Sequence, residues 1–139
     1  MTITYSLYEI LYEASGLKNE SEKIDKLKKH DTPAIRKLLK FIYDEKVKIL
    51  LPNSIPPWKR NNIHNIQSEL IRSIRKLNMF TEGTGYDTLK PVKREHLFIQ
   101  FLESIDDNDA SYVVLALTDR KIDGLEKETI EKAYDGIFD

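Results

Sequence analysis

The tetrapeptide Lys121-Ile122-Asp123-Gly124 has the Lys-x-Asp-Gly pattern in which one class of nucleotidyl-transfer enzymes carries its lysine nucleophile. Such a lysine needs a pocket that lowers its pKa, together with groups that bind the nucleotide and carboxylates that bind metal. Only 15 residues follow Gly124, and their pattern predicts one helix and a short tail. We therefore interpret the match as accidental and expect no catalytic residue and no enzymatic activity.

Other patterns that could bind a metal or a cofactor are incomplete. The three histidines, His30, His64 and His96, are far apart in the sequence and show no zinc-ligand spacing. The acidic run at 106–109 lacks the glycine and the final glutamate of a calcium loop, so we interpret it as a helix cap. The Gly83-Thr84-Gly85 sequence lacks the full spacing of a phosphate-binding loop. We expect no metal, no cofactor and no small-molecule substrate.

The chemistry that remains is that of lysine and arginine, which can contact phosphates without catalysis. The net charge is −1, but residues 18–94 contain 18 Lys and Arg against 9 Asp and Glu, whereas residues 95–139 contain 4 against 12. The candidate phosphate contacts in the basic part are Arg36, Lys37, Lys40, Lys59, Arg60, Arg72, Arg75, Lys76, Lys90, Lys93 and Arg94. If these side chains adjoin, they form a surface for a polyanion; the alternative is that they are ordinary solvated helix faces.

These residues must be positioned by helices, because apolar residues recur mostly at helical spacing. The sequence predicts an all-α fold, a single domain of about seven short helices over residues 1–139. The predicted helices begin near Ser6, Asn19, Thr32, Ile63, Pro91, Asp106 and Glu126. Residues 47–52 could extend the third helix or leave it, and Tyr112–Leu117 could form a strand, although its neighbours favour helix. Residues 52–62 and 81–90 are predicted to be flexible loops.

Composition indicates a soluble, cytoplasmic protein. The 139 residues are 40% hydrophobic and include no cysteine, which excludes disulfides and thiolate chemistry. The N-terminus has no basic segment followed by an apolar run, and no stretch approaches the roughly 20 apolar residues of a membrane span. Trp58 follows two prolines, where it could stack on a base, but an anchor that holds the loop to the core is favoured.

Two segments carry a resemblance to a known family. They are LYEILYEASGLKNESEKIDKLKKHDTPAIRKLLKFIYD and REHLFIQFLESIDDNDASYVVLALTDRKIDGLEKETIEKAYDGIF, which together cover about two thirds of the chain. In the order of their helices, their glycine turn and the tail Tyr134–Phe138, they resemble the helical N-terminal DNA-binding domain of ATP-dependent DNA ligases of phage type. The middle of the chain matches only through LLPNSIPPWK. The chain is also similar to small proteins of T-even-type marine phages.

The resemblance implies a function for the turn and for the basic helices. In the ligases this module grips duplex DNA through backbone phosphates, with amide donors from helix ends and glycine turns and charge from Arg and Lys. By that resemblance, Arg120, Lys121 and Gly124 would belong to one phosphate-facing turn. We therefore expect a non-catalytic, sequence-independent protein that binds duplex or nicked DNA in phage replication, repair or transcription.

Two other functions fit the same fold. One is an adaptor that binds a phage or host replication or transcription protein, in which case exposed apolar residues such as Tyr8, Tyr12 or Phe80 would matter more than the cations. The other is a structural protein of the virion. No membrane partner is expected.

Overall fold

The first part of the chain forms three helices whose starts are fixed by local side chains. The structure is a computed structural model that describes residues 6–60 and 69–139. The three helices are α1 (Leu7–Ser15), α2 (Glu20–Lys29) and α3 (Pro33–Tyr43). The side chains of Ser6, Asn19 and Thr32 each accept a hydrogen bond from the backbone N–H three residues later. Each cap satisfies one N–H that has no partner inside its helix, and the predicted starts are confirmed.

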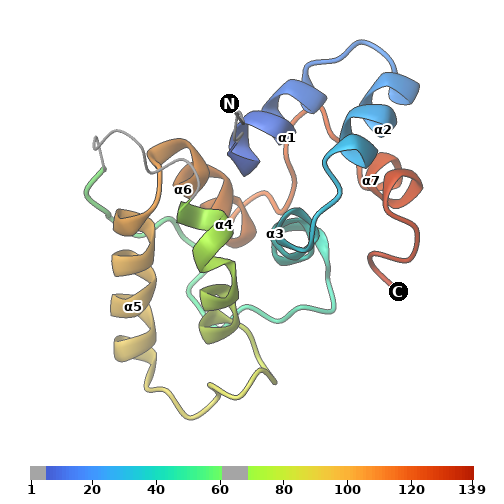
Figure 1. The fold of residues 1–139 in the computed structure, drawn as a ribbon. Helices are drawn as coiled ribbons and strands as arrows, with labels where there is room; N and C mark the ends of the chain where they lie inside the picture. The colour runs from blue at the N-terminus through green and yellow to red at the C-terminus, as the bar shows by residue number, and fades with distance from the viewer. Residues whose placement is uncertain (1–5, 61–68) are drawn as a thin grey trace.

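The centre of the molecule is α3, around which the other helices are arranged (Figure 1). Its apolar residues at Ile35, Leu38, Leu39 and Ile42 are completely buried. It packs against α6 and both 3₁₀ helices, while α2 packs against α1 and α7. Such burial explains why α3 is stable in spite of its short length, because tertiary packing of one face supplies most of the stability of short helices.

The second part of the chain alternates α-helices with 3₁₀ helices. The elements are α4 (Glu69–Ser73), η1 (Ile74–Phe80), α5 (Pro91–Ser104), α6 (Asp107–Val113), η2 (Val114–Leu117) and α7 (Lys127–Ala133). The predicted fourth helix lies partly at 63–68, outside the described residues; its remainder is α-helical only to Ser73 and then becomes 3₁₀ through Phe80. The spacing of Ile74, Leu77 and Phe80 suits a 3₁₀ helix, in which side chains three apart lie on one line. Phe80 is fully buried, which corrects its expected exposure.

The stretch at 47–52 leaves α3 and does not extend it. The N–H of Leu50 donates to the carbonyl oxygen of Phe80 at 2.8 Å, and that of Glu82 donates to Lys48 at 2.9 Å. These bonds form an isolated bridge between Ile49 and Thr81. Within residues 6–60 and 69–139 there are only such isolated bridges and no strand, and residues 112–117 are helical. The prediction of an all-α fold is therefore confirmed.

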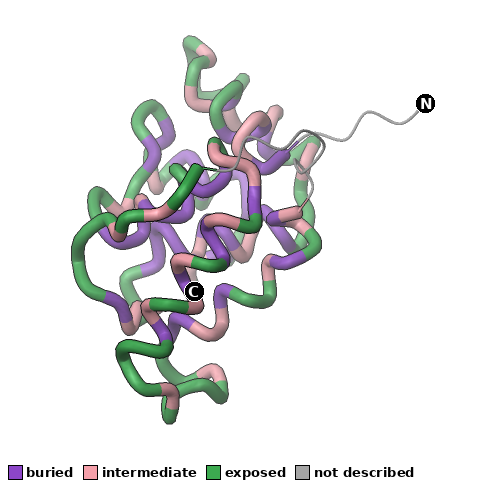
Figure 2. The backbone as a smooth tube through the Cα atoms, turned by 90° about the vertical axis from the view of Figure 1, so that its left-hand side faces the viewer, coloured by how far each residue is buried: buried purple, intermediate pink, exposed green. Residues whose placement is uncertain are grey.

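Apolar residues of the helices and of the loops pack into one hydrophobic core. Figure 2 shows buried stretches through the middle of the molecule and exposed ones on the projecting turns. Ile137 is buried near the C-terminus, and half-buried Trp58 packs against the core as an anchor. In the loop after η1, the N–H of Gly83 donates to the Asp87 carboxylate at 2.8 Å, and the Thr84 hydroxyl donates to the Thr81 carbonyl at 2.9 Å.

None of the described helices is long and apolar enough to cross a membrane.

Candidate nucleic-acid interface

The Lys-x-Asp-Gly turn is held against α1 and α3. The hydroxyl of Tyr43, in α3, accepts a hydrogen bond from the N–H of Ile122 and donates one to the carbonyl oxygen of Leu125, both at 2.7 Å. Gly124 has φ of +85°, and a Cβ atom added there would lie 2.4 Å from the carbonyl oxygen of Ser15. Glycine is therefore required in this turn both by its backbone conformation and by the close approach of α1.

Arg120, at the start of this turn, points back toward the protein. Its Nε donates to the carbonyl oxygen of Ile42 at 3.0 Å, and its Nη2 donates to those of Phe41 at 3.3 Å and Asp44 at 2.9 Å. These carbonyls lie at the end of α3, where helix oxygens lack intrahelical partners. Arg120 thus caps α3, and we remove it from the expected phosphate contacts. Lys121 is exposed and has no hydrogen bond or ion pair to the rest of the described chain.

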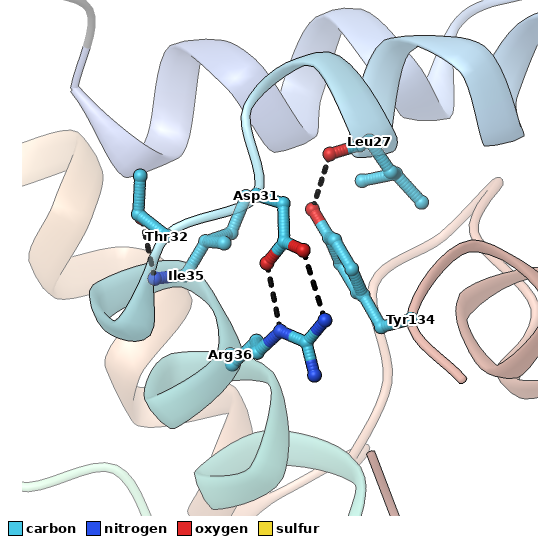
Figure 3. A network of polar contacts seen from close by, with 6 residues as sticks. All are labelled: Leu27, Asp31, Thr32, Ile35, Arg36 and Tyr134. Carbon is cyan, nitrogen blue, oxygen red and sulfur yellow. Dashed lines mark hydrogen bonds and ion pairs between the residues drawn. The ribbon is translucent and has the colours of Figure 1, made fainter. Parts of the chain in front are cut away.

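Arg36 is also engaged within the protein (Figure 3). Its Nε and Nη2 donate to the two carboxylate oxygens of Asp31 at 2.7 and 2.8 Å, and its guanidinium carbon lies 5.1 Å from the centre of the Tyr134 ring. The hydroxyl of Tyr134 donates to the carbonyl oxygen of Leu27 at 2.6 Å. Hydrogen bonding to Arg36 lowers the pKa of Asp31. This bidentate, ring-stacked geometry ties α2, α3 and the C-terminal tail together and leaves Arg36 a poor phosphate contact.

Arg94 is buried, with only 5% of its surface exposed. Its Nε donates to the carbonyl oxygen of Met79 at 3.2 Å, and its Nη2 donates to that of Tyr86 at 2.9 Å. It therefore holds the loop at 81–90 onto α5. A buried guanidinium with backbone partners cannot reach a phosphate without breaking those bonds, so Arg94 is also removed from the expected interface.

Two further arginines form ion pairs that remain accessible. Arg60 Nη1 lies 2.9 Å from the carboxylate of Asp107, at the start of α6. Arg72 Nη2 lies 2.9 Å from the carboxylate of Glu69, one turn earlier in α4. The arginine side chains are 74% and 66% exposed, respectively. Exposed pairs of this kind contribute at most about 1 kcal/mol, so an incoming phosphate can compete for either arginine.

One hydrogen bond joins the cationic helix α3 to η1. The ammonium group of Lys37 donates to the side-chain oxygen of Asn78. Asn78 lies three positions after Arg75 and therefore on the same line of η1, and Arg72 lies three positions before Arg75, near the end of α4. Lys40 follows Lys37 by one turn of α3. We call the surface formed by Lys37, Lys40, Arg72 and Arg75 the α3–η1 basic face.

Within the described residues, only one of the four charges on the α3–η1 basic face is balanced by an ion pair, that of Arg72 with Glu69. Arg75 is exposed and Lys40 half-buried, and neither has a hydrogen bond or an ion pair from its side chain within residues 6–60 and 69–139. Burial and the neighbouring Lys40 charge both lower the pKa of Lys37. Like charges on adjacent turns repel one another, and an anion placed between them would relieve that repulsion.

Four other predicted contacts are exposed but lie at different places, among them Lys90, directly before α5. Lys76 follows Arg75 directly, although it is not on the same line of η1. Lys59 precedes the undescribed segment, and its backbone N–H donates to the carboxylate of Glu103 at 2.7 Å. Lys93 lies in the first turn of α5. The α3–η1 basic face therefore includes only part of the predicted basic set.

Sequence reasoning missed Asn78, because an uncharged residue gives no electrostatic signal. Asn78 follows Arg75 by three residues, a spacing that aligns the two side chains on one line of a 3₁₀ helix but not of an α-helix. The sequence pattern would therefore have indicated this alignment only if it had predicted η1 as 3₁₀. The described part of the chain contains no group of three His, Asp or Glu side chains that could hold a metal ion.

The fold and this surface define an all-α protein with adjoining cationic helices. Residues 10–124 match a family of unknown function (DUF6433), and the chain belongs to this family. No curated protein and no solved structure matches the chain.

Proposed function

We propose that the protein is a non-catalytic, sequence-independent DNA-binding protein that contacts duplex phosphates through the α3–η1 basic face. The observation that carries the proposal is the contact between Lys37 and Asn78, which joins the cationic helix α3 to η1, the element that contains Arg75. Of the four cations, only Arg72 forms an ion pair within the described chain, and that pair is exposed.

The composition of this face favours phosphate over bases. Lysine and arginine on exposed helix surfaces neutralise phosphates and release counterions, which gives affinity without sequence preference. Four such contacts predict a salt slope of about −3.6, at about −0.9 for each phosphate. The resemblance of the sequence to the DNA-binding domain of ligases supports the same reading. A role in phage replication, repair or transcription, in the host cytoplasm, is part of this proposal.

The proposed absence of catalysis rests on the environment of Lys121. A lysine nucleophile is activated in a desolvated pocket or beside another cationic group. Lys121 is exposed, and Asp119 and Asp123, two positions away on either side, are acidic and exposed. The guanidinium of the adjacent Arg120 is directed to the carbonyls at the end of α3. We assign Lys121 no chemical step.

The test is binding of fluorescent intact, nicked and single-stranded DNA, measured by anisotropy at about 50 and about 200 mM salt. The double variant Lys40→Ala/Arg75→Ala should weaken binding to every sequence and reduce the salt slope by about two units. The matched control is Lys28→Ala/Lys29→Ala, which removes the same charge from exposed positions on α2. The proposal is overturned if no DNA binds at the lower salt, or if the control loses as much affinity as the test variant.

A further inference from the structure

Three tyrosine rings form a cluster between α1 and α6. The rings of Tyr8 and Tyr12, one turn apart on α1, are stacked with their centres 5.3 Å apart and their planes inclined by 18°. The ring of Tyr112, on α6, lies 4.7 Å from that of Tyr8, tilted by 55°. Tyr112 is buried, whereas 59% of Tyr12 is exposed. The cluster therefore runs from the core to the surface and presents an aromatic face to solvent.

A hollow of about 360 Å³ opens beside these rings. It is bounded by the tyrosine cluster, by the hydroxyl-bearing residues Ser15 and Ser111, and by the turn at 119–123. None of these residues belongs to the α3–η1 basic face. The hollow is thus a second candidate site, separate from the one that we propose for DNA.

The hollow has acidic walls. Asp119 and Asp123 line it, both are exposed, and neither forms an ion pair within the described chain. Burial, followed by Tyr12 and Asp106, raises the pKa of Tyr8, and burial with the nearby charges raises that of Tyr112 to about 12. The phenols of Tyr8 and Tyr112 therefore stay neutral at ordinary pH. Among the described residues that line the hollow, Lys121 is the only cation.

Stacked neutral rings next to unpaired carboxylates are complementary to an arginine side chain. The negative face of a tyrosine ring attracts a cation, and the planar guanidinium can stack on the ring while it donates two hydrogen bonds to a carboxylate. The protein already contains this arrangement, because Arg36 stacks on Tyr134 and binds Asp31 through two hydrogen bonds. A phosphate, by contrast, would be repelled by the carboxylates.

We propose that the hollow binds a basic segment of a partner protein, whose arginine side chain stacks on Tyr12 and pairs with Asp119 or Asp123. The charge of the hollow selects a cationic partner, and the flat ring of Tyr12 selects a guanidinium over an ammonium group. The protein would thereby hold DNA on one surface and a basic protein segment on another. This inference does not depend on the DNA proposal, because the two surfaces share no residue.

The test uses synthetic peptides of alternating glycine and arginine, glycine and lysine, or glycine and glutamate, titrated into the full chain and followed by NMR and calorimetry. We expect the arginine peptide to bind tightest and to shift the signals of Tyr8, Tyr12 and Tyr112. Tyr12→Ala should weaken that binding about fivefold. Tyr12→Phe should bind the arginine peptide as tightly as the unaltered protein does, because it keeps the aromatic ring that supplies the contact. Asp123→Asn should also weaken it.

The matched control is Tyr86→Ala, which removes another exposed tyrosine, 43% exposed, from the loop at 81–90. It should leave peptide binding unchanged. The inference is overturned if the arginine peptide does not bind, if it binds no better than the lysine peptide, or if Tyr12→Ala and Tyr86→Ala bind it equally well. The alternative occupant of the hollow is a second copy of the chain, which sedimentation can detect. Self-association that Tyr12→Ala abolishes would show that a second copy fills the hollow and would contradict a separate partner.

Discussion

Arg120 donates a hydrogen bond from its Nε to the carbonyl oxygen of Ile42 at 3.0 Å, across 78 positions of the sequence. Two further bonds to carbonyls at the end of α3 accompany it. Arg120 also has a left-handed backbone conformation, with φ of +56°, which is uncommon for a residue other than glycine. The arginine therefore holds the turn before α7 onto the central helix, and its role is structural.

Replacing Arg120 by alanine should lower the free energy of unfolding by about 3 kcal/mol, because three carbonyls at the end of α3 lose a charged donor. Urea denaturation measures the change. Lys121→Ala, one residue later and exposed, should change stability by no more than about 0.5 kcal/mol. Reduced DNA affinity in a variant with normal stability would instead make Arg120 a phosphate contact.

Gly124→Ala should destabilise the protein much more than Gly83→Ala. Both glycines have positive φ, +85° and +80°, so each substitution carries a conformational cost of about 1–2 kcal/mol. Only at Gly124 does the new Cβ meet an obstacle, the carbonyl oxygen of Ser15 at 2.4 Å; at Gly83 nothing lies within 4 Å. We expect a loss of about 3 kcal/mol or more at Gly124 and about 1 kcal/mol at Gly83. Equal losses in thermal or urea unfolding would show that α1 moves aside.

The stability of the protein should fall as the pH rises from about 4 to about 7, because of Asp109. This carboxyl group is fully buried, and burial raises its pKa to about 7, although the hydrogen bond from the N–H of Tyr8, at 2.9 Å, acts in the opposite direction. The charges of Asp106 and Glu9 raise it further. In this pH window the folded protein keeps a proton that the unfolded chain, with a pKa of about 3.9, has lost.

The effect of Asp109 amounts to about 1.4 kcal/mol for each pH unit in that window, and the curve should be flat above it. Asp109→Asn keeps an oxygen that accepts from Tyr8 but cannot ionise. Its free energy of unfolding, measured by urea denaturation between about pH 5 and about pH 8, should therefore depend less on pH than that of the unaltered protein. Equal pH dependence in the two proteins would assign the effect to another group.

How much of the structure can be predicted from the sequence depends on how far apart in the sequence the interacting residues lie. The caps at Ser6, Asn19 and Thr32 act on residues three positions away, so a short window suffices to predict the starts of α1, α2 and α3. The partners of Arg94 are carbonyls 8 and 15 positions away, and a carbonyl partner of Arg120 lies 78 positions away, so no short pattern indicates them. The sequence therefore predicts the all-α class and the positive charge of the middle segment, but not which cations the fold uses internally.

The same limit applies to the candidate sites. Tyr8 and Tyr12 are one helical turn apart, and this spacing alone places them together. Tyr112 joins them only through the packing of α6 on α1, and the acidic turn at 119–123 reaches them only because Tyr43 and Gly124 hold it against α3 and α1. A local pattern can suggest the aromatic pair, whereas the hollow beside it follows from the tertiary fold.

Arg36 and Lys40 lie one turn apart on α3 and should respond in opposite ways to replacement by alanine. Arg36 is bound to Asp31 and stacked on Tyr134, so Arg36→Ala should cost about 1 kcal/mol of stability and change DNA affinity little. Lys40 has no partner for its side chain in the described structure, so Lys40→Ala should leave stability within about 0.5 kcal/mol. Its DNA affinity should fall for every sequence, and its salt slope should decrease by about one unit. Urea denaturation and DNA anisotropy on the same two variants measure both effects, and the reverse pattern would place the phosphate contact at Arg36.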